Sequence, residues 1–255
     1  MKHLKITAIA LALSLSGAAQ ASTITLETFT TAGWQSAAQG GIFEDFENAT
    51  AANRGFADNK AFVDPVNSAV YGELNAAGYN SRVGNFTTLG GVGTGTTCTD
   101  LLDANGGGCS QIALQYDPGI NGQGNAYPET GEWSLNSADT EGMLWTAERE
   151  DGGMFQRLVF ALTDPADTGD KSLEISVNGT TETWKSLSNG ATWLAVINLD
   201  APTNAVAVEI RTSLRDGFTL DGAALAPVPL PASVLFLLGG LGMMAVFRRR
   251  NAQTA

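Results

Sequence analysis

The segment 171–187, KSLEISVNGTTETWKSL, constrains the fold more than any other part of the chain. Leu173, Ile175 and Val177 alternate with polar residues, which is the period of a β-strand with one buried face. The Asn178-Gly179 pair then supplies two residues that tolerate positive φ, and Asn-Gly between alternating runs is the strongest short signal for a hairpin. The segment therefore predicts two antiparallel strands joined by a tight turn.

Further short strands are predicted around this hairpin. The segment 156–162 is apolar and rich in β-branched and aromatic residues, which indicates a buried strand, and similar runs follow at 192–199, 205–214 and 217–227. Short strands at near-regular spacing, separated by turn residues, are typical of antiparallel sandwiches. We therefore expect a mainly β chain with one antiparallel, jelly-roll-like β-sandwich.

A short helix is predicted near the start of this domain. Thr30 or Thr31 can cap a helix that runs through Ala38, and Gly40 and Gly41 end it. A strand is expected on each side of this helix.

The part from about residue 64 to residue 131 is rich in Gly, Asn and Thr, which predicts loops and short strands. Within it, Cys98 and Cys109 close the loop CTDLLDANGGGC. In an oxidising compartment such a pair predicts one disulfide, and the chain-entropy model values it at roughly 3 kcal/mol.

The N-terminal sequence MKHLKITAIALALSLSGAAQAS predicts a secretory signal peptide over residues 1–21. A basic start precedes an apolar stretch, and the small residues Ala19 and Ala21 precede Ser22, as at a signal cleavage site. We expect cleavage after Ala21, export through the Sec machinery, and an ectodomain over residues 22–226.

A second apolar run covers residues 232–247, and three arginines follow it. Its 16 residues reach about 24 Å as a helix, slightly less than a hydrocarbon core of about 30 Å. Flanking residues can close such a gap, so we expect a transmembrane helix. By the positive-inside bias, residues 248–255 form a basic cytoplasmic tail that contains Arg248, Arg249 and Arg250.

A short proline-bracketed motif precedes this run within the spacer 227–231, and the three parts together resemble the PEP-CTERM class of sorting tails. The motif VPLPA resembles the VPLPA-CTERM variant; it comprises Val228, Pro229, Leu230, Pro231 and Ala232. The resemblance implies an exported protein of a Gram-negative bacterium. It also implies anchoring in the inner membrane followed by processing by an exosortase, an integral-membrane protease that resembles a transpeptidase.

Charge and histidine content exclude several functional classes. All 26 acidic residues but only nine of the 14 basic residues lie in the ectodomain, which leaves it a net charge of −17. Such a surface repels nucleic acid, so no nucleic-acid partner is expected. The only histidine, His3, lies in the signal peptide, which excludes a Ser-His-Asp triad and histidine-ligated metals from the mature protein.

Acidic side chains supply the remaining candidate chemistry. Oxygen ligands without histidine suit calcium, and the first and last strands of a jelly roll often lie together. A calcium site is therefore one hypothesis, and solvated, turn-forming acidic residues are the alternative. The candidate ligands are Glu47, Asp216 and Asp221.

Three functions remain open on the sequence alone. The first is a non-enzymatic protein of the cell surface or extracellular matrix, with extracellular polysaccharide as a candidate ligand. The second is a secreted carbohydrate-active enzyme that uses paired carboxylates, although no catalytic residue can be assigned. The third is an adhesin-like protein that keeps its membrane anchor. Trp34, Trp133, Trp145, Trp184 and Trp193 could stack on sugars, with core packing as the alternative.

Overall fold

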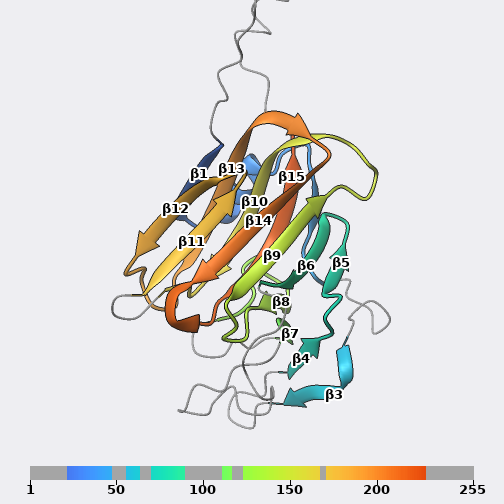
Figure 1. Cartoon of the computed structure of the whole chain (residues 1–255), viewed down its shortest axis with the longest axis vertical. Coiled ribbons are helices and arrows are strands. Elements are labelled where there is room, and N and C mark those ends of the chain that lie inside the picture. Colours follow the sequence, from blue (N-terminus) through green and yellow to red (C-terminus); the bar gives the residue numbers. More distant parts are fainter. Residues whose placement is uncertain are drawn as a thin grey trace, which may run out of the picture.

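Two antiparallel sheets face each other in the computed structural model, which describes residues 22–47, 56–63, 70–89, 111–116, 123–166 and 171–227 (Figure 1). The first sheet has the strand order β1-β13-β10-β15-β8-β7-β4-β3, with β2 also paired to β15. Its strands are β1 (Thr23–Thr28), β2 (Ile42–Glu44), β3 (Phe56–Val63), β4 (Val70–Leu74), β7 (Ala113–Tyr116), β8 (Trp133–Asn136), β10 (Phe155–Thr163), β13 (Thr192–Thr203) and β15 (Thr219–Ala226).

The second sheet has the order β12-β11-β14-β9-β6-β5. Its strands are β5 (Tyr79–Ser81), β6 (Gly84–Thr88), β9 (Gly142–Glu148), β11 (Ser172–Val177), β12 (Thr180–Lys185) and β14 (Ala205–Thr212). The expected mainly β, antiparallel sandwich is therefore confirmed.

The predicted hairpin forms between β11 and β12, with Val177 paired to Thr180. Asn178 and Gly179 have φ values of 49° and 78°, the left-handed backbone that a tight two-residue turn requires. The buried face of β11 consists of the predicted apolar residues Leu173, Ile175 and Val177.

The predicted short helix is α1 (Thr31–Ala37), which lies on the outer face of the first sheet. Thr30 caps it in extended conformation, and its hydroxyl accepts a hydrogen bond from the Gly33 amide at 3.0 Å. Trp34 anchors the helix by packing on Val159, Leu194 and Ala224.

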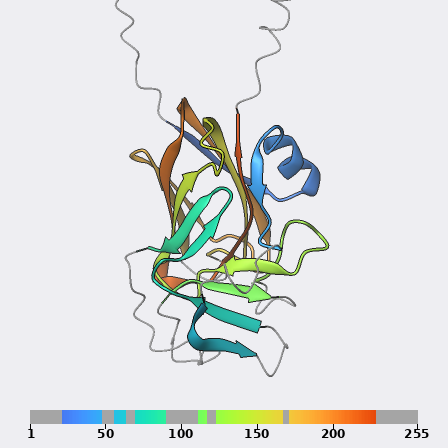
Figure 2. The ribbon, with the colours of Figure 1, turned by 90° about the vertical axis from the view of Figure 1, so that its right-hand side faces the viewer.

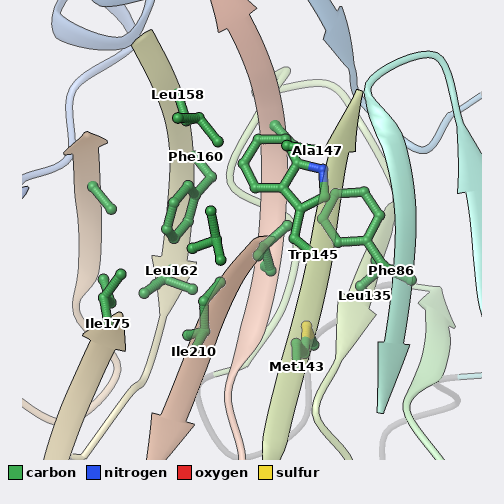
Figure 3. Close-up of a cluster of buried hydrophobic side chains, with 14 of the residues drawn as sticks. Phe86, Leu135, Met143, Trp145, Ala147, Leu158, Phe160, Leu162, Ile175 and Ile210 are labelled. Carbon is green, nitrogen blue, oxygen red and sulfur yellow. The ribbon is translucent and has the colours of Figure 1, made fainter. Parts of the chain in front are cut away.

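The core lies between the two sheets, and a chain of aromatic contacts that we call the aromatic seam crosses it; its members are Phe46, Phe86, Trp145 and Phe160. Figure 3 shows the last three of these rings. Phe86 and Trp145 stack at 5.2 Å within the second sheet, and Trp145 meets Phe160 of the first sheet edge-on at 5.8 Å. The indole N–H of Trp145 donates to the Val83 carbonyl at 2.9 Å, so its polar group is satisfied inside the core.

The two ends of the sandwich carry different strand ends and turns. We call the end with the start of β1 and the end of β15 the proximal end (Figure 2). The register places Thr23 opposite Asn198, Asn198 opposite Arg157, and Arg157 opposite Ala226. Thr23 at the start of β1 and Ala226 at the end of β15 therefore lie on one line across the sheet. They are three strand spacings, or about 14 Å, apart. The opposite, distal end carries the 3-10 turn η2 (Ser213–Arg215) and the start of β15.

A matched pair of leucines tests the assignment of the core. Leu162 is fully buried in β10, whereas Leu214 in η2 is 81% exposed. Leu162→Ala should lower the free energy of unfolding by about 2–5 kcal/mol because it leaves a cavity, and Leu214→Ala should change it by less than about 0.5 kcal/mol. Urea unfolding of both variants measures this difference, and equal losses would contradict the fold.

Candidate functional site

The predicted C-terminal tail begins directly where the sandwich ends. Leu225 and Ala226, the last residues of β15, are fully buried. Gly41 packs so closely on this strand that a Cβ there would lie 2.5 Å from the Leu225 carbonyl oxygen. Pro227 is already exposed and is the last described residue. The tail is therefore attached to a rigid, central strand.

Several predicted features lie outside the described residues. They include the signal peptide up to Ala21, the pair Cys98 and Cys109, the motif from Val228 to Ala232, and Arg248 to Arg250. Ser22, the first described residue, is buried directly before β1. Within the part of the chain that the structure describes, no helix combines the length and hydropathy of a membrane span.

Two of the three predicted calcium ligands, Glu47 and Asp221, approach the same loop, residues 123–133. The Glu47 Oε1 atom accepts hydrogen bonds from the backbone amides of Glu132 and Trp133, both at 2.8 Å. It also accepts a longer one from Asn125 Nδ2 at 3.4 Å.

Asp221 holds the other half of this loop. Its Oδ2 atom accepts from the amides of Ala126 and Tyr127 at 2.7 and 2.8 Å, and its Oδ1 atom accepts from Gly222. Burial raises the pKa of Asp221 well above its usual value, the three backbone donors lower it, and the Glu47 carboxylate raises it further. The two carboxylates therefore share one neighbourhood, and each binds backbone N–H groups of the loop.

Aromatic rings complete the attachment of this loop to α1. Tyr127 stacks on Trp34 with ring centroids 3.7 Å apart, and Phe43 meets both rings edge-on. Gly222 has a φ of 54°, and its carbonyl accepts the Trp34 indole N–H at 2.5 Å. A Cβ at residue 222 would lie 3.0 Å from that indole nitrogen, so the position favours glycine. The Thr31 hydroxyl also donates to the Glu129 carboxylate.

The third predicted ligand, Asp216, has different partners at the distal end. Its carboxylate forms a 2.5 Å ion pair with Lys171. It also lies close enough to Asp139 to raise the pKa of that residue. The structure thus brings Glu47 to Asp221 and places Asp216 in a second acidic group. Among the described residues, no group of three or more His, Cys, Asp or Glu side chains could hold a metal ion.

Asp139 is the residue of this second group that sequence reasoning missed. Burial and the nearby Asp216 carboxylate raise its pKa from 3.8 to about 6, while Lys171 and the Gly217 amide lower it. Ala138 and Asp139 both have positive φ, at 53° and 54°. Two consecutive left-handed residues that are not glycine are an uncommon backbone feature, but the sequence SADTEG carries no signal for them.

A buried amide network lies beside this acidic group. Asn136 Nδ2 donates to the side-chain oxygens of Gln115 and Gln123 at 2.6 and 2.8 Å. Thr219 exchanges two hydrogen bonds with the backbone of Gly124 at 2.8 and 3.0 Å. These contacts fasten residues 123 and 124 over the sheet, so the described carboxylates and amides at this end hold the loop in place.

The tryptophans divide into two groups. Trp34 and Trp145 are buried, whereas Trp133, Trp184 and Trp193 are partly buried. Trp133 packs edge-on against Tyr116 at 4.9 Å and borders the core. Core packing therefore accounts for the two buried rings and most of the surface of Trp133.

Comparison with known proteins identifies the tail. Residues 227–251 match the PEP-CTERM protein-sorting motif. The chain is therefore an exported protein that is anchored in a membrane before an exosortase processes it. No curated protein matches the chain.

Solved structures give only weak similarities. A cyclase from Fischerella sp. TAU, in complex with 4-(1H-indol-3-yl)butan-2-one, is 10% identical and covers 69% of this chain and 95% of its own, with a TM-score of 0.31. The CBM22-1–GH10 modules of the Clostridium thermocellum endo-1,4-β-D-xylanase 10B, complexed with xylohexaose, are 15% identical over 43% of this chain, with a TM-score of 0.29. The insecticidal crystal protein Cry2Aa is 18% identical over 37% of this chain, with a TM-score of 0.25. The chain spans 24% of the xylanase structure and 17% of the crystal protein. At these TM-scores none of the three carries an argument about this protein.

The raised pKa of Asp139 predicts a pH dependence of stability. A carboxyl with a higher pKa in the folded state than in the unfolded state destabilises the fold above its folded pKa, and protonation relieves this cost. The free energy of unfolding should therefore rise as the pH falls from about 7 to about 4.

Replacing Asp139 tests this dependence. Asp139→Asn keeps an acceptor for the Gly217 amide and removes the charge, so it should add on the order of 1–3 kcal/mol at pH 8 and flatten the profile. Chemical unfolding between pH 4 and 8 measures the effect, with the exposed Asp200→Asn as the control. An unchanged slope in Asp139→Asn would refute the assignment.

Proposed function

We propose that the mature protein is a non-enzymatic component of the cell surface or extracellular matrix of a Gram-negative bacterium. The sorting tail supports the route, and its motif Val228-Pro229-Leu230-Pro231-Ala232 has the VPLPA form. Signal cleavage before Ser22 then frees the N-terminus, and the exosortase acts on the C-terminal side.

The observation that carries this proposal is the attachment of the tail to the proximal end. β15 leads into the motif at residue 227, and β1 begins at the same end of the sandwich, three strand spacings away. An anchored precursor would therefore hold its proximal end at the membrane and present its distal end to the exterior. This arrangement suits a displayed domain.

The contacts of the carboxylates support a non-enzymatic role. The four described carboxyl groups with raised pKa values are Glu44, Glu47, Asp139 and Asp221. Each accepts at least one backbone N–H, and Glu47 and Asp221 fasten a loop by this means. A carboxylate bound to backbone donors stabilises the fold and has fewer lone pairs for a substrate. A glycoside hydrolase with paired carboxylates is the alternative activity.

An ectodomain with a net charge of −17 repels anionic polymers, so neutral or cationic polysaccharide is the ligand class that its charge favours. Among the described residues, Phe43 is an exposed aromatic side chain that could stack on a sugar; it is 39% exposed beside Tyr127. Calcium bound near Glu47 and Asp221 stays a prediction. Calorimetry with calcium on the purified ectodomain tests it, and the absence of both heat and a thermal shift would exclude it.

The sorting step is tested by the intact mass of the native protein in each cell fraction. We expect a chain that starts at Ser22 and lacks Arg248 to Arg250, recovered outside the inner membrane. A double variant, Pro229→Ala with Pro231→Ala, should keep its C-terminal tail and stay in the inner membrane, because the motif that the exosortase reads is altered. Native protein that still carries Arg250 in the membrane would instead support a permanently anchored adhesin.

Binding without turnover is tested on a panel of extracellular polysaccharides. We expect retention of at least one neutral polysaccharide and no release of sugars. Phe43→Ala should weaken retention by about fivefold to a hundredfold, the value of one stacked ring, whereas Leu214→Ala at the distal end should not. If the protein releases reducing sugar, and if Asp139→Asn abolishes this release, the protein is a hydrolase and the proposal is wrong.

A further inference from the structure

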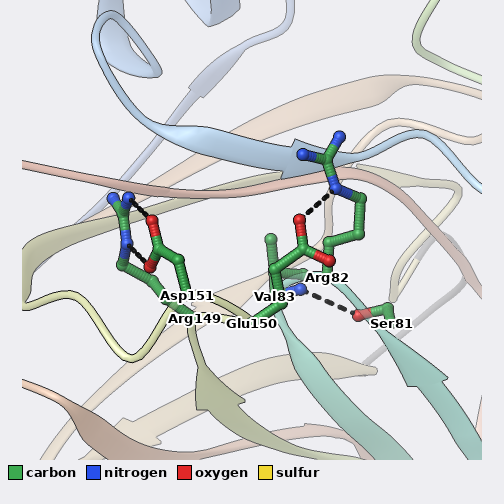
Figure 4. A network of polar contacts seen from close by, with 6 residues as sticks. All are labelled: Ser81, Arg82, Val83, Arg149, Glu150 and Asp151. Carbon is green, nitrogen blue, oxygen red and sulfur yellow. Dashed lines mark hydrogen bonds and ion pairs between the residues drawn. The ribbon is translucent and has the colours of Figure 1, made fainter.

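Lys171 and Asp216 form the most buried ion pair among the described residues. Their Nζ and Oδ1 atoms lie 2.5 Å apart, and the two side chains are 24% and 10% exposed. The other described ion pairs contain arginine instead of lysine, and their carboxylates are 42–52% exposed. A guanidinium stays charged in proteins, whereas a lysine amine becomes a nucleophile once it loses a proton. Figure 4 shows two of the arginine pairs, Arg82 with Glu150 and Arg149 with Asp151.

Backbone contacts hold the members of the lysine pair together. Lys171 directly precedes β11, and the amide of the next residue, Ser172, donates to the Ser213 hydroxyl in η2 at 2.7 Å. Asp216 follows η2, and its carbonyl accepts from the Thr212 hydroxyl at 2.6 Å. The fold therefore positions the pair, although its members are 45 residues apart.

A third side chain, Asp139, reaches the same place from a neighbouring turn. Ser137 and Phe218 exchange two hydrogen bonds, at 2.8 and 2.9 Å, which fix this turn against the segment that follows η2. Asp139 accepts from the Gly217 amide, and a Cβ at residue 217 would lie 2.7 Å from the Asp139 Oδ1 atom. The Asp139 carboxyl therefore lies against the backbone directly after Asp216.

These three groups are the ones that amide formation between two side chains requires. A neutral amine acts as the nucleophile, a neutral carboxyl group accepts it, and an acid–base group moves protons between them. Transfer of one proton within the contact, from the Lys171 ammonium to the Asp216 carboxylate, produces both neutral forms, which exclusion of water favours.

Asp139 suits the role of the acid–base group. It interacts electrostatically with both members of the pair. Burial, and then the Asp216 carboxylate, raise its pKa to about 6, so it exchanges a proton near neutral pH. Because the fold holds the reacting groups in contact, the amine has a high effective concentration at the carboxyl group.

We propose that Lys171 and Asp216 condense to an intramolecular isopeptide bond, with Asp139 as the proton-transfer residue. A bond forms between Lys171 Nζ and Asp216 Cγ, and one C–O bond of Asp216 breaks. Two protons of the ammonium group leave with that oxygen as water. One of them passes directly within the contact, and Asp139 carries the other from the nitrogen to the leaving oxygen and returns to its starting state.

The bond would close the distal end of the sandwich. Lys171 lies at the start of β11 in the second sheet, and Asp216 lies on the connection from β14 in the second sheet to β15 in the first. The domain would then resist unfolding and proteolysis at this end. The pH dependence of stability expected for Asp139 belongs to the ion-paired chain, and Lys171→Arg keeps the protein in that state.

The mass of the full chain tests the inference. The protein is produced with its own signal peptide and tail, purified and reduced, and its mass is compared with that of its sequence between the termini found by peptide mapping. Loss of one water should leave the wild type lighter by about 18 Da. Proteolysis should also release a pair of peptides joined through Lys171 and Asp216.

Three variants accompany the wild type. Lys171→Arg keeps the positive charge but removes the amine, and Asp139→Asn keeps an acceptor for the Gly217 amide but cannot transfer a proton. Both should have the full mass of their sequences. Lys185→Arg, in the exposed edge strand β12, is the matched control and should keep the bond.

A wild-type chain of full mass, with Lys171 in an unmodified peptide, would overturn the inference whatever the variants do. A loss of about 18 Da that persists in Lys171→Arg would come from cyclisation of an Asp-Gly sequence such as Asp216-Gly217, and would also overturn it. A linked peptide in Asp139→Asn would overturn the role assigned to Asp139. Sorting and polysaccharide binding do not enter this measurement, so their failure would leave its result unchanged.

Discussion

The contact between Trp145 and Phe160 joins the two sheets, and the rest of the architecture depends on it. Trp145 lies in β9 and Phe160 in β10, so the short connection between these strands carries the chain from one sheet to the other. Phe86 and Phe46 extend the aromatic contact toward β2, which lies beside β15. Because these rings bury large apolar areas, their packing fixes the spacing of the sheets and hence the position of every strand end. The point from which the tail leaves is therefore set by the core.

Outside the core, polar side chains fasten the loop 123–133 to the first sheet, in addition to the stacking of Tyr127 on Trp34. Glu47 and Asp221 accept four backbone N–H groups of this loop, and Thr219 exchanges hydrogen bonds with Gly124. Asp221 is fully buried and Glu47 partly buried, so both carboxylates lose solvation; burial, and to a lesser degree repulsion by Glu47, raises the pKa of Asp221. The backbone donors offset part of that cost. Glu47 and Asp221, which the sequence suggests as metal ligands, thus stabilise the position of this loop.

The sequence predicts the second half of the fold well and the first half poorly, for physical reasons. Alternation and an Asn-Gly turn specify β11 and β12, and a threonine cap specifies α1, because these signals are local. Between residues 64 and 131, the abundance of Gly, Asn and Thr weakens the sequence signal for β4 to β7. β4 pairs with β7 and β6 pairs with β9, which are distant in the chain, whereas β5 and β6 form a local hairpin. The group of Asp139, Lys171 and Asp216 could not be predicted, since its members are 32 and 45 residues apart and meet only through folding. The sequence predicts that Glu47 and Asp221 lie close together only because the first and last strands of a jelly roll are often neighbours.

The position of β15 has a consequence for the timing of folding. Among the described strands, β15 is the last to be synthesised, yet it lies inside its sheet between β10 on one side and β2 and β8 on the other. Pairing across such long sequence separations is slow, because much chain entropy is lost before the contacts form. The first sheet therefore has a gap until β15 arrives, and β15 directly precedes the sorting tail. A chain that crosses the membrane from its N-terminus onward would stay incompletely folded until its final segment follows. Completion of the sandwich and arrival of the tail at the membrane would then be nearly simultaneous events.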